Sequence, residues 1–216
     1  MAARVEGVGV GWQVVLAAVL SIGLGLAGAV SLVVRASESD EPTHVPADLF
    51  ASATTVSTAA TSSPGTAAPT KGAFVAQDAG FSAVFPTTPQ RQQQQIDTAG
   101  VTLQATLYIA TTSDEVVGAA SAPTPFNPSG SSLQAGLDGA INGTAQNTKG
   151  TVVSRSMTTY LGVPAEDGVV STPSSGVIHE RVLFRDRKIF VLLVITEKAN
   201  TAHPHYDRLL ATFKPL

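Results

Sequence analysis

Two histidines near the C-terminus are the residues whose types and spacing are best suited to chemistry. His203 and His205 flank Pro204, and Asp207 follows two positions later. Imidazole nitrogens and carboxylate oxygens both bind zinc, so His203, His205 and Asp207 are weak candidates for a metal site. The same residues also suit an exposed first turn of a helix that begins at Pro204. We therefore predict no metal ion and no cofactor.

A third histidine, His179, lies in a segment with the alternating pattern of a strand. Successive residues of a strand point to opposite faces, so His179 and Arg181 share one face and Glu180 points to the other. A general base must lie within hydrogen-bond reach of the proton that it removes. The sequence shows no nucleophile to pair with His179, and it predicts no catalytic residue.

Four basic residues concentrate at one expected hairpin. They could face an anionic partner such as a lipid headgroup or a cell-wall polymer, or they could form an ordinary solvated turn. The four are Arg181, Arg185, Arg187 and Lys188.

Several function classes lack their signatures. The chain has no cysteine, which excludes disulfides, thiolate metal sites and a cysteine nucleophile. It also lacks a Walker loop, a dinucleotide-binding fingerprint and a GxSxG motif. Residues 73–216 carry ten Lys or Arg and eleven Asp or Glu. Because nucleic-acid binders usually show a clear basic excess, we predict no nucleic-acid partner.

The N-terminal part of the chain contains an uncharged run of 28 residues, 7–34, after a short tail at residues 1–6. About 20 apolar residues are enough to cross a bilayer, so the run predicts a transmembrane helix that anchors the chain in the lipid bilayer. Trp12 lies near one end, where interfacial aromatic residues are common. The alternative is a signal peptide cleaved near Ala29, which would leave a secreted protein.

Residues 35–72 form the next segment, and they have the composition of a linker. Of residues 36–72, 25 of 37 are Ala, Ser, Thr or Pro. So few large apolar side chains cannot bury enough surface to offset the entropy of ordering, and we predict a disordered linker. Ser/Thr-rich tracts with Pro are typical of extracellular stalks, so the C-terminal domain is predicted to lie outside the cytoplasm.

Residues 73–216 carry all the strong periodicity and are predicted to form a single, monomeric domain. Residues 92–95 fall in an expected connection between strands. The apolar run 189–195 predicts a strand buried on both faces, which requires a covering layer on each side. Helices are expected through Leu133, Leu137 and Ile141, and again near the C-terminus. The expected strands are 81–85, 101–109, 115–120, 151–159, 165–171, 177–184 and 188–196. The predicted fold class is α+β, a mainly antiparallel sheet with helices on both faces, that is, an α/β/α sandwich.

Short motifs in this domain resemble a known group. Gly80-Phe81-Ser82-Ala83-Val84-Phe85-Pro86 resembles the opening of many small exported bacterial domains, and Leu161-Gly162-Val163-Pro164-Ala165 resembles a later step. The hairpin segments 181–184 and 188–192 and the closing aromatic Phe213 resemble theirs as well. These domains are similar to the PsbP-like α/β/α sandwich group, uncharacterised membrane-anchored proteins among them. The resemblance implies export and a binding or accessory role rather than catalysis.

Two functions from different classes follow. The first is a membrane-anchored, extracytoplasmic binding or accessory module of the cell envelope, not an enzyme, whose partner is an envelope protein or polymer. The alternative is a hydrolase or a metal-dependent enzyme that uses His179 or the group of His203, His205 and Asp207. A pocket lined by these histidines would favour the enzyme, and a flat or purely apolar surface would favour binding.

Overall fold

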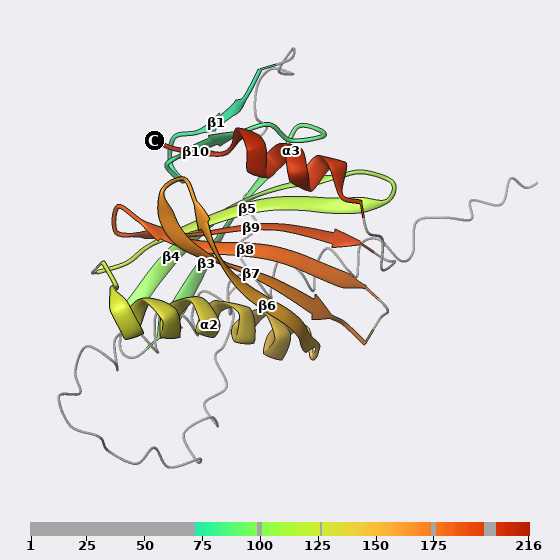
Figure 1. Ribbon diagram of the computed structural model, residues 1–216. Coiled ribbons are helices and arrows are strands. Elements are labelled where there is room, and N and C mark those ends of the chain that lie inside the picture. The colour runs from blue at the N-terminus through green and yellow to red at the C-terminus, as the bar shows by residue number, and fades with distance from the viewer. Residues whose placement is uncertain (1–71, 99–100, 126, 174–175, 197–201) are drawn as a thin grey trace, which may run out of the picture.

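The computed structural model describes residues 72–98, 101–125, 127–173, 176–196 and 202–216 (Figure 1). The predicted N-terminal tail, the predicted transmembrane helix at 7–34 and all but the last residue of the predicted linker lie outside the described residues. Within the described ranges, no helix has both the length and the apolar character needed to span a membrane.

The domain is built around a seven-stranded sheet in which all neighbouring strands are antiparallel. Its spatial order is β3-β4-β5-β9-β8-β7-β6, so β3 and β6 are the two edge strands. The strands are β3 (Gln90–Thr98), β4 (Val101–Thr111), β5 (Glu115–Pro123), β6 (Thr151–Tyr160), β7 (Val163–Ser171), β8 (Val177–Arg185) and β9 (Lys188–Thr196).

The apolar strand β9 lies at the centre of this order, and both of its faces are buried. Ile189, Val191, Leu193 and Ile195 pack on one face of the sheet. Phe190, Leu192 and Val194 pack on the other. This alternation divides the interior into two hydrophobic clusters, one on each side of the sheet.

Helix α2 (Gly130–Asn147) packs against β6, β7 and β8 on the first face. It also connects the central strand β5 to the edge strand β6. The helix approaches closely because small residues meet there: a Cβ atom on Gly168 of β7 would lie 2.9 Å from Ile141 of the helix. Gly136, Gly139 and Gly143 of α2 are also buried.

The second face is covered by a small sheet and one short helix. Strands β1 (Phe74–Ala76) and β10 (Lys214–Pro215) pair with β2 (Phe81–Ala83) on either side of it. Helix α3 (Pro204–Thr212) lies beside this sheet (Figure 1). Leu209 and Phe213 are buried against the main sheet, whereas Leu210 is only partly buried.

The predicted α/β/α sandwich is therefore wrong. The protein consists mostly of antiparallel strands in two sheets, and its described residues include only two helices. The chain segments at both ends of the domain, which have too few residues for a helical layer, pair with each other as the three-stranded sheet. The second layer is therefore a mixed layer of sheet and helix.

The prediction that residues 92–95 form a connection is also wrong, since they lie within β3. The side chains of Arg91, Gln93 and Gln95 are exposed, and those of Gln92 and Gln94 are half-buried. An edge strand with this much solvent contact does not need alternating apolar residues, so the periodicity that identifies other strands is absent.

Candidate functional site

An open groove of about 740 Å³ lies between helix α3 and the outer strands β6, β7 and β8. Its floor contains three cross-strand pairs, since opposite residues of antiparallel strands project from the same face. We call this feature the α3 groove. In order along the strands, the pairs are Asp167 with Arg181, Val169 with His179 and Ser171 with Val177.

Helix α3 provides one wall of the α3 groove through His203, Tyr206, Asp207 and Leu210. Positions three and four apart lie on the same side of a helix, which explains why these four face the floor together. The opposite rim is Val153 of β6, which lies at a register irregularity between Val152 and Ser154. The groove thus combines apolar rims with several polar side chains.

The strongest chemical feature of the α3 groove is a pair of histidines. The ring centroids of His179 and His203 are 4.3 Å apart, with a tilt of 47° between the rings. His203 is only 8% exposed, and neither of its ring nitrogens has a hydrogen-bond partner among the described residues. Burial, and secondarily the neighbouring His203, lowers the pKa of His179. A neutral imidazole offers one donor and one acceptor, so this pair can bind a polar ligand group.

An ion pair fixes the far end of the groove floor. Arg181 Nε donates to Asp167 Oδ1 at 2.6 Å, and Arg181 Nη2 donates to Asp167 Oδ2 at 2.8 Å. The guanidinium carbon also lies 4.8 Å from the ring centroid of Tyr160. Two parallel hydrogen bonds to one carboxylate restrict both side chains. Arg181 is therefore neutralised within the chain and does not give the groove a net positive charge.

The structure separates the three weak candidates for a metal site. His203 packs on His179, whereas His205 Nε2 lies 3.8 Å from Glu115 Oε1 at the start of β5. Asp207 lines the α3 groove, but His205 does not. No group of three His, Asp or Glu residues in the described ranges is arranged to hold a metal ion. The expectation of an exposed first turn is wrong for His203, because its ring is enclosed between α3 and β8.

The side chain of Glu180 points away from the groove, as its place in the strand predicts. It is about 1% exposed, and its Oε2 accepts a hydrogen bond from the Thr144 hydroxyl of α2 at 3.0 Å. Burial raises its pKa to about 8. Glu166 of β7 is also buried, and its burial followed by the nearby Asp138 carboxylate raises its pKa to about 7. These two buried carboxyls form a pH-sensitive pair beneath α2.

The four basic residues of the predicted anion-facing hairpin are not brought together on one free surface. Arg181 pairs with Asp167 in the groove. Arg185 donates to the Leu161 carbonyl oxygen and pairs with Asp186. Arg187 Nη2 donates to the Pro125 carbonyl oxygen at 2.9 Å. Lys188 extends across to Gly80, where an added Cβ atom would lie 2.0 Å from its Nζ.

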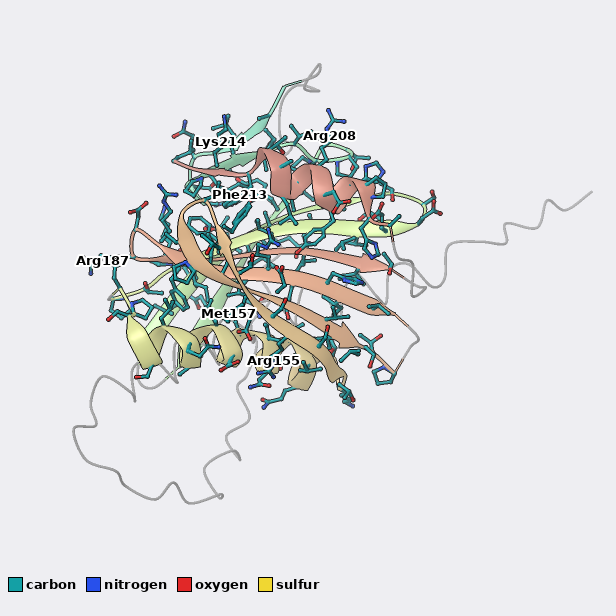
Figure 2. The ribbon with its side chains drawn as sticks, viewed as in Figure 1. Arg155, Met157, Arg187, Arg208, Phe213 and Lys214 are labelled. Carbon is teal, nitrogen blue, oxygen red and sulfur yellow. The ribbon has the colours of Figure 1, made fainter. Side chains whose placement is uncertain are left out.

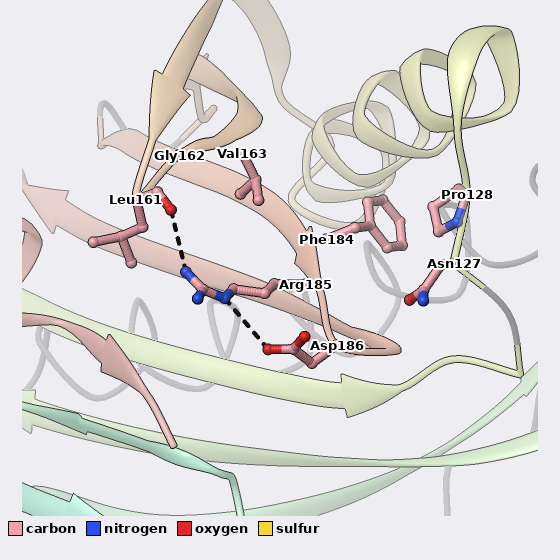
Figure 3. A pocket seen from close by; sticks show the side chains of 8 residues that line it. All are labelled: Asn127, Pro128, Leu161, Gly162, Val163, Phe184, Arg185 and Asp186. Atoms are coloured by element: carbon pink, nitrogen blue, oxygen red, sulfur yellow. Dashed lines mark hydrogen bonds and ion pairs between the residues drawn. The ribbon is translucent and has the colours of Figure 1, made fainter.

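A second pocket, of about 410 Å³, lies beside this hairpin (Figure 3). Figure 3 shows Arg185 bound between the Leu161 carbonyl and the Asp186 carboxylate, with Phe184 turned toward Pro128. The amide oxygen of Asn127 accepts a hydrogen bond from the Arg187 backbone. The polar groups of this pocket are already engaged, so the α3 groove is the better candidate site.

Sequence reasoning identified His179, Arg181, His203 and Asp207 but missed the rest of the α3 groove. Asp167 and Val169 were not singled out, although pairing β7 with β8 across their loop would have placed Asp167 opposite Arg181. Tyr206 lies in the expected C-terminal helix but was not identified as a site residue. No local pattern indicated that α3 would pack on β5 and β9 and form a wall of the groove.

Comparison with known proteins found no family model and no curated protein that matches this chain.

Proposed function

We propose that this protein is a membrane-anchored, extracytoplasmic binding module of the cell envelope and that the α3 groove is its ligand site. The observation that carries the proposal is the buried His203 ring, which faces the groove with both nitrogens unpartnered among the described residues. A buried polar group without a hydrogen bond costs about 1–3 kcal/mol. A bound ligand that supplies the missing partner would recover part of that energy.

The shape and the lining of the groove support the binding of a ligand rather than a bond-breaking reaction. Several of its polar groups lie along an open floor, and its lining includes the apolar Val153, Val169 and Leu210. Ligand sites commonly combine an apolar lining with a few placed polar groups. The α3 groove has this composition.

The second candidate function is a hydrolase, and the specific observation in its favour is that His179 and His203 line one pocket. A hydrolase would need a nucleophile beside one of them. The hydroxyl of Ser171, the serine in the lining, instead donates to the Thr151 carbonyl oxygen at 3.4 Å. Ester hydrolysis by the full chain that disappears in His179→Ala would establish this second candidate over the first.

The anchor and the export are supported by the uncharged run 7–34 and by the Ser/Thr/Pro-rich segment after it. The PsbP-like resemblance adds little about the groove, because its residues serve local structure: Gly80 and Gly162 have positive φ angles, and Phe213 is in the core. We propose that this chain belongs to the PsbP-like group.

We expect a reporter enzyme that is active only after export to be active when fused after Leu216. The physical reason is that a single apolar span places the two ends of the chain on opposite sides of the membrane. The measurement is reporter activity in whole cells, with a cytoplasm-specific reporter at the same position as the control. An inactive export reporter beside an active cytoplasmic one would reverse the proposed topology.

We expect ligand binding to perturb His179 and His203 and to leave His205 unchanged. The chain contains four histidines, so histidine-selective isotope labelling of the full chain in detergent micelles gives few NMR signals, which His→Gln variants assign. The probes are a glucose trisaccharide, a short-chain lysophospholipid below its micelle concentration, and short strand-forming peptides. At least one class is expected to shift the two groove histidines.

The control is a matched pair of lysine substitutions. Val169→Lys fills the groove floor and is expected to abolish the shifts, whereas Thr159→Lys places the same charge at an exposed position on the other face of the sheet and is expected to preserve them. If no probe class shifts either groove histidine, or if Val169→Lys leaves the shifts intact, the α3 groove is not the ligand site.

A further inference from the structure

Strand β6 presents an open edge directly beside the α3 groove. It forms one rim of the seven-stranded sheet, and among the described residues no strand pairs with its outer side (Figure 1). After the irregularity at Val152 and Ser154, the register with β7 is regular from Ser154 to Tyr160. A row of backbone N–H and C=O groups along such an edge is a template for another strand.

The β6 edge lacks most of the features that usually prevent edge-to-edge pairing. Proteins protect edges with lysine, proline, inward-pointing charges, β-bulges or a covering segment, and of these β6 has the irregularity between Val152 and Ser154. Residues 151–160 contain no lysine and no proline, and their one charged residue is Arg155. The Arg155 guanidinium is bound on the α2 side, where Nη1 donates to Asp138 Oδ1 at 3.0 Å and Nη2 donates to Asn142. Figure 2 shows Arg155 beside this helix.

Large apolar side chains are exposed along the same strand. Val153 is 63% exposed and Met157 is 49% exposed, which are high values for apolar residues of a strand. Val153 is also the rim of the α3 groove. An added strand would cover apolar surface here as well as satisfy backbone groups.

Only small side chains separate the β6 edge from the groove, so a side chain from an added strand can reach the groove. Ser154 and Ser156 lie opposite Val169 and Asp167 and therefore point to the groove side of the sheet. Both are small and exposed. An added strand would lie about 4.8 Å from β6. Long side chains of a strand can contact residues beyond their nearest cross-strand neighbours, so one could cross these serines.

The charge at the far side of the groove favours a basic side chain. Asp207 lines the wall and has no ion-pair partner among the described residues. The Asp167 carboxylate is offset by Arg181. The apolar stem of a lysine or arginine suits the groove walls, and its charged end suits Asp207.

We propose that the β6 edge binds an extended polypeptide segment of a partner protein as an additional antiparallel or parallel strand, and that this segment directs a lysine or arginine side chain into the α3 groove. The inference rests on the proposed function, since it names the ligand class of the same groove. Recognition by strand addition obtains affinity from main-chain hydrogen bonds and specificity from pockets for alternate side chains.

The test uses the full chain in detergent micelles and a set of nine-residue peptides, Ac-TVSVXVSVT-NH2, in which X is each of the twenty amino acids. Binding is followed through the His179 and His203 NMR signals. Peptides with X as arginine or lysine are expected to bind about tenfold more tightly than the peptide with glutamate, because the last places a carboxylate near Asp207. Asp207→Asn is expected to reduce that preference, and Asp186→Asn, at an exposed carboxylate of the distant hairpin, is expected to preserve it.

Backbone N-methylation of the arginine peptide tests strand addition without altering the protein. Methyl groups on residues 4 and 6, or on residues 3 and 7, block opposite edges of the peptide strand. An antiparallel and a parallel strand present opposite edges to β6 when residue 5 faces the groove, so a version methylated on residues 3, 4, 6 and 7 is blocked in both orientations and is expected to bind about tenfold more weakly than the parent.

Each other outcome overturns the inference. Binding of the version methylated on both edges as tightly as the parent would mean that only a side chain is recognised. All twenty peptides could fail to bind while the saccharide or the lysophospholipid shifts the groove histidines. In that case the proposed function stands and a peptide is excluded as the ligand. Failure of every probe class would contradict both the proposed function and the inference of a peptide ligand. Concentration-dependent dimerisation that Ser156→Lys abolishes would assign the edge to a second copy of this chain.

Discussion

Phe213→Ala is expected to lower the free energy of unfolding by about 3–5 kcal/mol. Phe213 ends helix α3 and is only 1% exposed. Its ring centroid lies 5.4 Å from those of Phe81 and Phe190 and 6.5 Å from that of Tyr160. Figure 2 places Phe213 between α3 and the main sheet. One ring therefore joins the helix, the small sheet and two strands of the main sheet, and its loss leaves a cavity where all of them meet.

Chemical denaturation of the full chain in detergent, followed by the near-ultraviolet signal of its tyrosines, measures this effect. Leu216→Ala is the matched control, because it removes a large apolar side chain that is exposed, three residues further along the chain. Leu216→Ala and the half-exposed His205→Ala are expected to stay within about 0.5 kcal/mol. Equal midpoints for Phe213→Ala and Leu216→Ala would mean that α3 is not docked on the sheet, and the α3 groove would lose its wall.

Glu180→Gln is expected to remove the larger part of the loss of stability that the buried carboxyls of Glu180 and Glu166 cause between pH 4.5 and pH 8. Burial raises the pKa of Glu180 in the folded protein to about 8, above its ordinary value of 4.5. A carboxyl with a raised folded-state pKa stabilises the fold fully below its unfolded-state value, and this contribution is lost as the pH rises through the folded-state value. Over that range the ionisation of Glu180 alone is expected to cost the wild-type chain on the order of 4 kcal/mol.

Glutamine keeps the shape of the side chain and can still contact Thr144, but it does not ionise. Glu180→Gln is therefore expected to be more stable than the wild type at pH 8 and similar to it at pH 4.5. The measurement is the free energy of unfolding in urea at a series of pH values. Gln93→Glu adds a carboxyl at an exposed position of β3 and serves as the control that keeps the wild-type profile. A wild-type profile that is flat, or that rises toward pH 8, would contradict the buried state of Glu180.

Several elements of the fold could be predicted because the local pattern of their apolar residues indicates which of their faces are buried. The apolar run 189–195 predicted a strand covered on both faces, and β9 lies at the centre of the sheet. The four-residue spacing of Leu133, Leu137 and Ile141 predicted α2 and its buried side. In these segments the periodicity of the apolar residues reflects the period of the element itself.

Other elements could not be predicted, because nothing local distinguishes them from loops. The polar edge strand β3 has no apolar alternation. Strands β1 and β10 have three and two residues, and they exist only because β2 lies between them. Pairing between segments more than a hundred residues apart depends on the fold as a whole, and this pairing is why the predicted sandwich was wrong.

The candidate site divides in the same way. That His179 and Arg181 share one strand face and Glu180 the other followed from the two-residue period of a strand, and the contacts of Glu180 with α2 and of His179 with α3 agree with it. The partners themselves did not follow. His203 was expected on an exposed turn, but the docking of α3 buries it against His179.

The sequence by itself thus determined the uncharged span at 7–34, the linker composition, the long strands other than β3, helix α2 and the direction of each side chain on strand β8. Only the tertiary structure decided which layer covers the second face, which carboxyls lose their solvent, and which residues form the α3 groove. The physical reason is the distance along the chain over which each property is determined. Side-chain direction depends on the backbone within a few residues, whereas burial, pKa and the groove depend on atoms brought from distant parts of the chain.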